Sequence, residues 1–236
     1  MNNNEMIKFL KERIKRLNEI GLALSKEDDT NVIFEMILEE AKNITHADGR
    51  TLYMKNNDGD LKFEILRNDS KNTVMGGTSG IDIPFPPVKL IGEDGEPNEK
   101  NVSAYAAIHS RTINIKDAYE EEGFDFSGAK NYDKNFDYRS KSFLTVPLID
   151  HENEVIGVMQ LINATNPKTN ETIDFSKEMQ DQVESLASQG AVALTNKKLV
   201  AELKNLFESF IKLIATAIDK KSPYTGGHCE RVPEIT

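Results

Sequence analysis

The spacing of apolar residues divides the chain into three regions, and the first is helical. From Glu5 to Ser25 the apolar positions recur every three or four residues between charged ones, which predicts an amphipathic helix. A second helix is predicted from Asp29 or Thr30, an N-cap residue type, to Asp48-Gly49. Its apolar stripe comprises Ile33, Met36, Ile37, Ala41 and Ile44.

The second region, from Arg50 to Asn163, changes to an alternating pattern typical of strands. Residues 52–54 and 61–66 flank an Asn-Asn-Asp-Gly turn, which predicts a hairpin. Residues 143–149 and 155–162 predict a second hairpin, and both of its strands are almost entirely apolar. We expect this hairpin at the centre of a sheet that is covered on both faces.

The third region predicts one helix from Ser176 to Lys220, with Gly190 as its only weak interior position. Its second half carries a broad apolar seam that a single exposed helix would leave in water. We therefore expect a parallel homodimer through the N-terminal and C-terminal helices. The seam comprises Leu199, Val200, Leu203, Leu206, Phe207, Phe210, Ile211, Leu213, Ile214, Ala217 and Ile218.

Composition narrows the functional classes. The 236 residues carry a net charge of −10 without a dense basic block, so nucleic acid is not an expected partner. A single cysteine, Cys229, excludes an intramolecular disulfide and fits a reducing cytosol. No apolar run has the length of a membrane span, and the N-terminus does not have the pattern of a signal peptide. We expect a cytoplasmic protein without a membrane partner.

Ordered motifs in the middle of the chain resemble GAF domains, the sensor modules of cyclic-nucleotide phosphodiesterases and related bacterial proteins. The motifs are Asn114-Ile-Lys-Asp-Ala-Tyr119, Phe136, Arg139 to Leu148 and Val155 to Asn163. The resemblance covers about residues 25–197. It implies an α+β fold, with an antiparallel sheet of about six strands, the terminal helices on one face and a ligand cavity on the other.

The resemblance also implies a ligand site and a possible ligand, a cyclic nucleotide or another small molecule. The implied lining is Phe85, Ser103, Ala104, Asp117, Ala118, Phe124 and Thr145. One family feature is absent: Asn163 is followed by Ala164, and Met179 and Gln180 stand where the family has an acidic pair, so its bracing Lys–Asp bridge cannot form. This departure weakens the assignment of a cyclic nucleotide. Phe85 and Phe124 as simple core residues, with Asp117 as a helix cap, remain an alternative.

Other sites fit the sequence less well. Heme would need an axial ligand, for which His109 is the one plausible candidate in the GAF region, and a surface position suits it better. We expect His46 and His151 to be exposed and Gly76 to Gly80 to form a flexible loop. The acidic residues Asp117 and Glu120 to Glu122 predict a solvated first helical turn instead of a metal site.

The last residues resemble the start of an HD-GYP domain, a metal-dependent phosphodiesterase of cyclic di-GMP. The matching positions are Tyr224, Thr225, His228, Arg231 and Val232. The resemblance implies His228 as a metal ligand for Fe or Mn in an intact HD-GYP domain. One histidine cannot hold a di-metal centre, so we expect no catalytic residues, no metal and no enzymatic activity in this chain itself.

We therefore predict four segments: an N-terminal helix (1–26), a GAF domain (27–197), a signalling helix (198–221) and the start of an HD-GYP domain (222–236). The expected function is to sense a small molecule, to dimerise and to regulate an HD-GYP phosphodiesterase. A purely structural dimerisation module and a sensor of heme or another metabolite are the alternatives.

Overall fold

The computed structural model describes residues 15–16 and 18–221, and the chain forms two compact units, Met1–Leu194 and Thr195–Thr236. Residues 15–16 and 18–26 are helical, as predicted; the rest of the predicted N-terminal helix lies outside the described residues. The remaining elements are α2 (Thr30–Thr45), β1 (Gly49–Lys55), β2 (Leu61–Asn68), β3 (Thr73–Gly76), η1 (Gly77–Ser79), α3 (Val102–Ile108), β4 (Ile113–Ile115), α4 (Ser127–Phe136), β5 (Phe143–Ile149), β6 (Val155–Ile162), β7 (Ala164–Thr165), β8 (Thr172–Ile173) and α5 (Lys177–Lys221).

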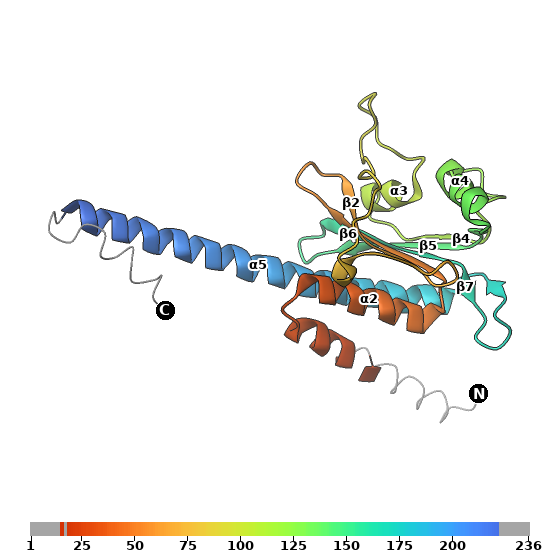
Figure 1. The fold of residues 1–236 in the computed structure, drawn as a ribbon, viewed down its shortest axis with the longest axis horizontal. Coiled ribbons are helices and arrows are strands. Elements are labelled where there is room, and N and C mark those ends of the chain that lie inside the picture. Colours follow the sequence, from red (N-terminus) through yellow and green to blue (C-terminus); the bar gives the residue numbers. More distant parts are fainter. Residues whose placement is uncertain (1–14, 17, 222–236) are drawn as a thin grey trace. The chain divides into compact units, whose positions relative to one another are not determined.

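The first unit is built on a six-stranded antiparallel sheet with the order β3-β2-β1-β6-β5-β4 (Figure 1). Both predicted hairpins form: β1 pairs with β2, and β5 pairs with β6. Gly59 has a φ of 87° in the first of these turns, a conformation that glycine adopts without strain. Strand β6 lies at the centre of the sheet, in agreement with its apolar sequence.

One face of the sheet is covered by α2 and the first part of α5 (Figure 1). Helix α2 begins where predicted, because the Asp29 carboxylate accepts a hydrogen bond from the Asn31 N–H, and it ends at His46 in the left-handed conformation. Ile33 and Ile37 of this helix are fully buried against Leu186 and Ala191 of α5 and the inner residues of the strands. This layer is the main hydrophobic core.

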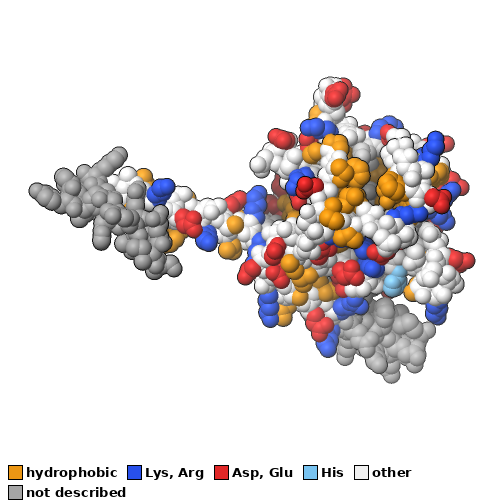
Figure 2. Space-filling view, in the orientation of Figure 1, with side chains coloured by type: hydrophobic (Ala, Val, Ile, Leu, Met, Phe, Trp, Pro, Cys, Tyr) orange, Lys and Arg blue, Asp and Glu red, His pale blue; other side chains and the backbone are white. Residues whose placement is uncertain are grey.

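The other face of the sheet carries α3, α4 and the irregular segment 80–101 (Figure 1). Helix α3 contacts β5 and β6, while two smaller apolar clusters fill the space beneath α3, α4 and the segment. Figure 2 shows hydrophobic side chains gathered where the segment crosses the front of the sheet. Ile81, Phe85 and Ile91 are the large hydrophobic residues of the segment that are exposed.

Two local expectations were wrong. The glycine-rich segment is ordered by hydrogen bonding: Gly76 ends β3, Gly77 begins η1, and Arg67 donates to the carbonyl oxygens of Met75 and Gly76 while pairing with Glu35 of α2. The acidic stretch does not begin a helix, because residues 118–120 form a turn in which the Asp117 carboxylate accepts the Tyr119 N–H. A short polar connection favours such a turn when an Asp side chain can accept the backbone N–H two residues further along the chain.

The second unit contains the later part of α5. Nine large apolar side chains of this part are between 43% and 68% exposed, as the sequence predicted for an unpartnered seam. They are Leu199, Val200, Leu203, Leu206, Phe207, Phe210, Ile211, Leu213 and Ile214. Across residues 15–16 and 18–221, no helix combines the length and apolar character required to span a bilayer.

Candidate ligand cavity

A cavity of about 320 Å³ lies between the sheet and the N-terminal ends of α3 and α4. Its size is at the lower end of the range typical of small-molecule sites. Strands β1, β5 and β6 supply its floor, and the two helices with the residues just before them supply its rim. The lining residues are Tyr53, Asn101, Val102, Ser103, Asp125, Phe126, Ser127, Gly128, Ala129, Phe143 and Gln160.

The floor of the cavity is polar because three strands place polar residues in register. Gln160 of β6 lies opposite Thr51 of β1 and opposite Thr145 of β5. The Gln160 Nε2 donates to Ser103 Oγ at 3.1 Å and to Thr145 Oγ1 at 3.2 Å. Ser103 and Thr145 are buried, so these bonds hold the Gln160 amide in one orientation.

Tyr53 brings a phenol to the same floor. Its hydroxyl lies 3.5 Å from Gln160 Oε1, and only 5% of the residue is exposed. Burial raises the pKa of Tyr53 to about 12, against an opposing hydrogen bond with Ser103. The phenol is therefore protonated at neutral pH and can donate or accept a hydrogen bond.

The walls of the cavity are aromatic. Phe126 and Phe143 are buried with their ring centroids 5.1 Å apart, and they belong to the apolar cluster beneath α3 and α4. Together with the Tyr53 ring, they offer flat apolar surfaces beside the polar floor. Such walls favour a planar ring over a flexible chain.

Two capping residues form the rim. The Asn101 side chain accepts the N–H groups of Ser103 and Ala104, which starts α3. The Asp125 carboxylate accepts the Ser127 N–H at 2.8 Å in the first turn of α4. This hydrogen bond is the main cause that lowers the pKa of Asp125, so its side chain is ionised at neutral pH.

Two of the residues implied by the family resemblance belong to this polar floor: Ser103 lines the cavity, and Thr145 bonds the amide of Gln160. Ala104 is buried in α3, next to Ser103.

The other implied residues lie outside the lining. Asp117 pairs with Arg139 at 2.9 Å, and the Ala118 N–H donates to the Lys141 carbonyl oxygen. Although burial opposes the change, the pKa of Asp117 is lowered by the Tyr119 N–H and by Arg139. These two contacts fix the turn at residues 118–120 to residues 139–141, which lead into β5.

The two implied phenylalanines pack against other rings. Phe124 makes an edge contact with Tyr105 at 5.2 Å between ring centroids. Phe85 is 44% exposed and packs on Phe63, 5.6 Å away, which in turn packs on Tyr53. Phe124 packs against the apolar cluster that contains Phe126 and Phe143, and Phe63 packs against the cluster that contains Tyr53.

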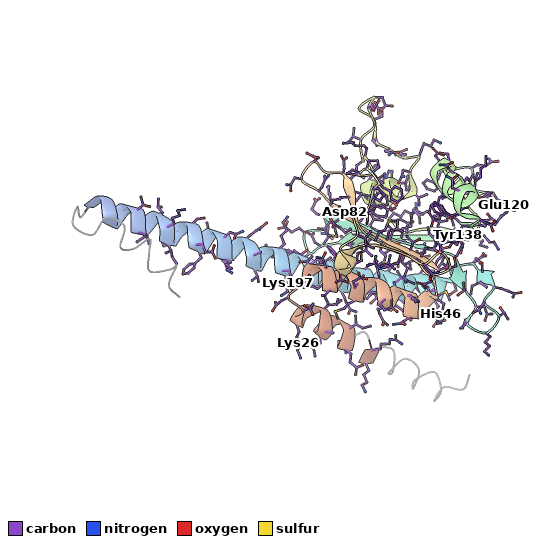
Figure 3. All side chains as sticks on the ribbon, viewed as in Figure 1. Lys26, His46, Asp82, Glu120, Tyr138 and Lys197 are labelled. Carbon is purple, nitrogen blue, oxygen red and sulfur yellow. The ribbon has the colours of Figure 1, made fainter. Side chains whose placement is uncertain are left out.

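Asn163 braces the segment that joins α4 to β5. It adopts a left-handed conformation, with φ 57°, at the end of β6. Its Oδ1 accepts the N–H groups of Lys141 and Ser142, and its Nδ2 donates to Tyr138 Oη and the Arg139 carbonyl oxygen. Tyr138 (Figure 3) also donates to Asp48 at 2.6 Å. This network fastens the cavity-covering layer without the family's Lys–Asp bridge.

The histidines of the first unit do not form a site. His46, His109 and His151 are exposed, and His46 lies at the end of α2 (Figure 3). His109 contacts Glu99 at 3.0 Å. Across residues 15–16 and 18–221, no three His, Cys, Asp or Glu residues gather as metal ligands would. His228 lies outside the described residues.

A larger hollow of about 630 Å³ lies at the sheet edge beside β5 and α5. No aromatic side chain lines it, and its residues include Arg111, Asp150 and Glu184. The smaller cavity is the better candidate, because it combines aromatic walls with a hydrogen-bonded polar floor.

The sequence reasoning missed most of the lining, including Tyr53, Phe126, Phe143 and Gln160. One signal was available: Gln160 is the only polar residue in the strand Val-Ile-Gly-Val-Met-Gln-Leu-Ile. Gln160 is half-buried, and an amide in an otherwise apolar strand needs hydrogen-bond partners, so it marks a polar site.

The sheet, its two helical layers and the cavity beneath α3 and α4 define a sensor domain of the GAF class. The GAF domain family matches residues 29–194, and the chain belongs to this family. It is 26% identical over 213 residues to a dual 3',5'-cyclic-AMP and -GMP phosphodiesterase 11A of Takifugu rubripes, a match that covers 89% of this chain and 22% of that protein. A cGMP-specific 3',5'-cyclic phosphodiesterase of Drosophila ananassae is 26% identical over 151 residues, which cover 61% of this chain and 12% of that protein.

Solved structures share the fold. The GAF domain of a phosphoenolpyruvate-protein phosphotransferase from Coxiella burnetii has a TM-score of 0.57 at 14% identity, with 80% of this chain and 96% of that chain covered. A GAF domain/HD domain protein from Geobacter sulfurreducens has a TM-score of 0.51 at 12% identity, with coverages of 75% and 98%. The chain is thus a GAF domain of a signalling protein, related to phosphodiesterases.

Proposed function

We propose that this protein senses a small molecule in the cavity between the sheet and helices α3 and α4. The observation that carries the proposal is the polar floor, where Gln160 is held by Ser103 and Thr145 beneath aromatic walls. Buried polar groups cost stability unless they are paired, and a packed core of apolar residues would serve a purely structural domain better. The cavity therefore supports a ligand-binding role over the structural alternative.

We further propose that the later part of α5 pairs with its copy in a parallel homodimer, together with the N-terminal helix. The seam presents nine large apolar side chains to water, and burial of each Leu or Phe contributes about 1.5–3 kcal/mol before the costs of association. Ligand binding that shifts the packing of α5 in the first unit can then alter the register of the paired helices. This arrangement suits a cytoplasmic regulatory module.

The regulated activity that we propose is an HD-GYP phosphodiesterase of cyclic di-GMP. The support is the resemblance of the last residues, which include His228 as a metal ligand for Fe or Mn in an intact domain. Since a GAF domain alone is not catalytic, we expect this chain to sense and to transmit. The chain spans 22% and 12% of the two phosphodiesterase relatives, so the activity of a longer protein belongs to this proposal.

Native mass spectrometry of freshly purified protein tests the sensing role. We expect a bound small molecule in the wild type, and its loss in Gln160→Leu, which removes the amide from the polar floor and keeps a similar volume. Thr112→Val, a change beside the sheet-edge hollow, is the matched control and should retain the molecule. A wild type that carries no small molecule and binds none from a metabolite library would favour the structural alternative.

Light scattering tests the dimer separately. The double change Leu203→Glu with Phe210→Glu places two charges in the seam and should give a monomer. Asn205→Glu with Lys212→Glu adds carboxylates to the helix without removing apolar side chains, and it should remain dimeric. A dimer that survives the first change would place the interface elsewhere.

A further inference from the structure

The cavity contains one charged side chain. Of the eleven residues that line it, all within the described part of the chain, Asp125 is ionised and none is Lys, Arg or His. A ligand with a phosphate would find no cation among the lining side chains. It would instead meet a carboxylate on the exposed rim.

Helix α4 could in principle attract an anion, because its first N–H groups lack partners within the helix. Its N-cap residue, Phe126, supplies no side-chain hydrogen bond. Asp125 fills that role: its Oδ1 accepts the Ser127 N–H, and its charge complements the helix dipole. Lys130 lies close enough to help lower the pKa of Asp125, but it packs over the Tyr119 ring at 5.1 Å and does not line the cavity. Asp125 therefore satisfies one of these N–H groups and places a negative charge at the end of the helix where a phosphate would bind.

The floor offers hydrogen-bond acceptors. The Gln160 amide uses its Nε2 for Ser103 and Thr145, while its Oε1 has only the long 3.5 Å contact with the Tyr53 hydroxyl. This oxygen can accept a further hydrogen bond from a ligand. The Asp125 carboxylate at the rim is a second acceptor, and Phe126 and Phe143 make the walls aromatic.

We propose that the cavity takes an uncharged planar heterocycle with N–H donors, of the nucleobase or nucleoside class, and that Asp125 is the residue that disfavours the phosphate-bearing counterparts. The inference rests on the proposed sensing role and specifies its ligand. The aromatic walls select the planar ring, the Gln160 Oε1 accepts an N–H of the ligand, and the Asp125 carboxylate repels a phosphate.

Isothermal calorimetry at low salt with matched ligand pairs tests the inference, because each pair differs only in the cyclic phosphate. The pairs are adenosine with cyclic AMP and guanosine with cyclic GMP. We expect at least one nucleoside to bind the wild type about tenfold more tightly than its cyclic phosphate, the order of effect of one like charge near the surface. Equal or tighter binding of the cyclic phosphates would overturn the inference.

Asp125→Asn then tests the role of the charge, since the amide oxygen can still accept the Ser127 N–H and keep the helix cap. This variant should bind the cyclic phosphate several-fold more tightly while its affinity for the nucleoside changes little. Glu120→Gln removes the same charge beside α4 (Figure 3), outside the lining, and should behave as the wild type. An unchanged ratio of the two affinities in Asp125→Asn would refute the assignment to Asp125.

The two levels of the proposal fail in different ways. If neither nucleosides nor free nucleobases bind, the proposed ligand class is overturned. If native mass spectrometry still finds another bound molecule, the sensing role stands. If no molecule is found by either method, the sensing role fails as well.

Discussion

Gly190 of helix α5 packs tightly against Ile37 of α2, and Gly190→Ala should destabilise the first unit. An added Cβ would lie 2.6 Å from Ile37 Cδ1 and 3.1 Å from Ile37 Cγ1. Ile37 is fully buried in the main core, so its side chain has no free space into which to turn. The tight contact must be relieved by an off-rotamer side chain or a shift of the helix.

Two opposing effects set the size of the change. Alanine is favoured over glycine inside a helix by about 1 kcal/mol. Overpacking of a dense core costs about 1–3 kcal/mol, and steric conflict on a fully buried β-branched neighbour belongs in the upper part of that range. We therefore expect a net loss of about 1–2 kcal/mol in the free energy of unfolding, although helix propensity alone predicts a gain.

Urea denaturation followed by circular dichroism measures this difference. Gly128→Ala in α4 is the matched control, because nothing lies within 4 Å of the added Cβ, and it should be neutral or stabilising. Ile37→Val in the Gly190→Ala background removes the crowded methyl group and should recover part of the loss, which a double-mutant cycle reports. A Gly190→Ala protein more stable than the wild type would show that α2 and α5 do not pack as tightly as described.

Three further outcomes follow from the site and the chain. Asn163→Ala removes four hydrogen bonds and leaves alanine at a positive φ, so the free energy of unfolding should fall by about 2–4 kcal/mol. Asn163→Asp keeps the acceptor and should lose less. Equal losses of the two variants in urea denaturation would contradict the bracing role. Because burial raises the pKa of Tyr53 from 10.0 to about 12, the phenol ionises first in the unfolded chain, and the wild type should lose up to about 3 kcal/mol of stability as pH rises from about 10 to 12. Tyr53→Phe should lack this component, and identical alkaline unfolding of the two proteins would count against it. The chain should not hydrolyse cyclic di-GMP with added Mn or Fe, and turnover that survives His228→Ala would show that this expectation is mistaken.

Local sequence patterns determined most of the framework. The periodicity of Ile33, Ile37 and Ala41 is enough to define α2, because a buried stripe must repeat every three or four residues. The two hairpins followed from alternating strands around polar turns, and the apolar sequence of β6 placed it at the centre of the sheet. The exposed seam on α5 was equally visible, because it depends on one continuous helix.

The cavity was decided by tertiary structure, because its residues come from five separate elements. The floor depends on the register that sets Gln160 opposite both Thr51 and Thr145, and register is a property of paired strands. Helices α3 and α4 are too short for a clear apolar period, so the sequence did not show that Asn101 and Asp125 would meet at one rim. The sequence therefore determined the layers of this protein, while the packing of short polar segments across the sheet determined its candidate ligand site.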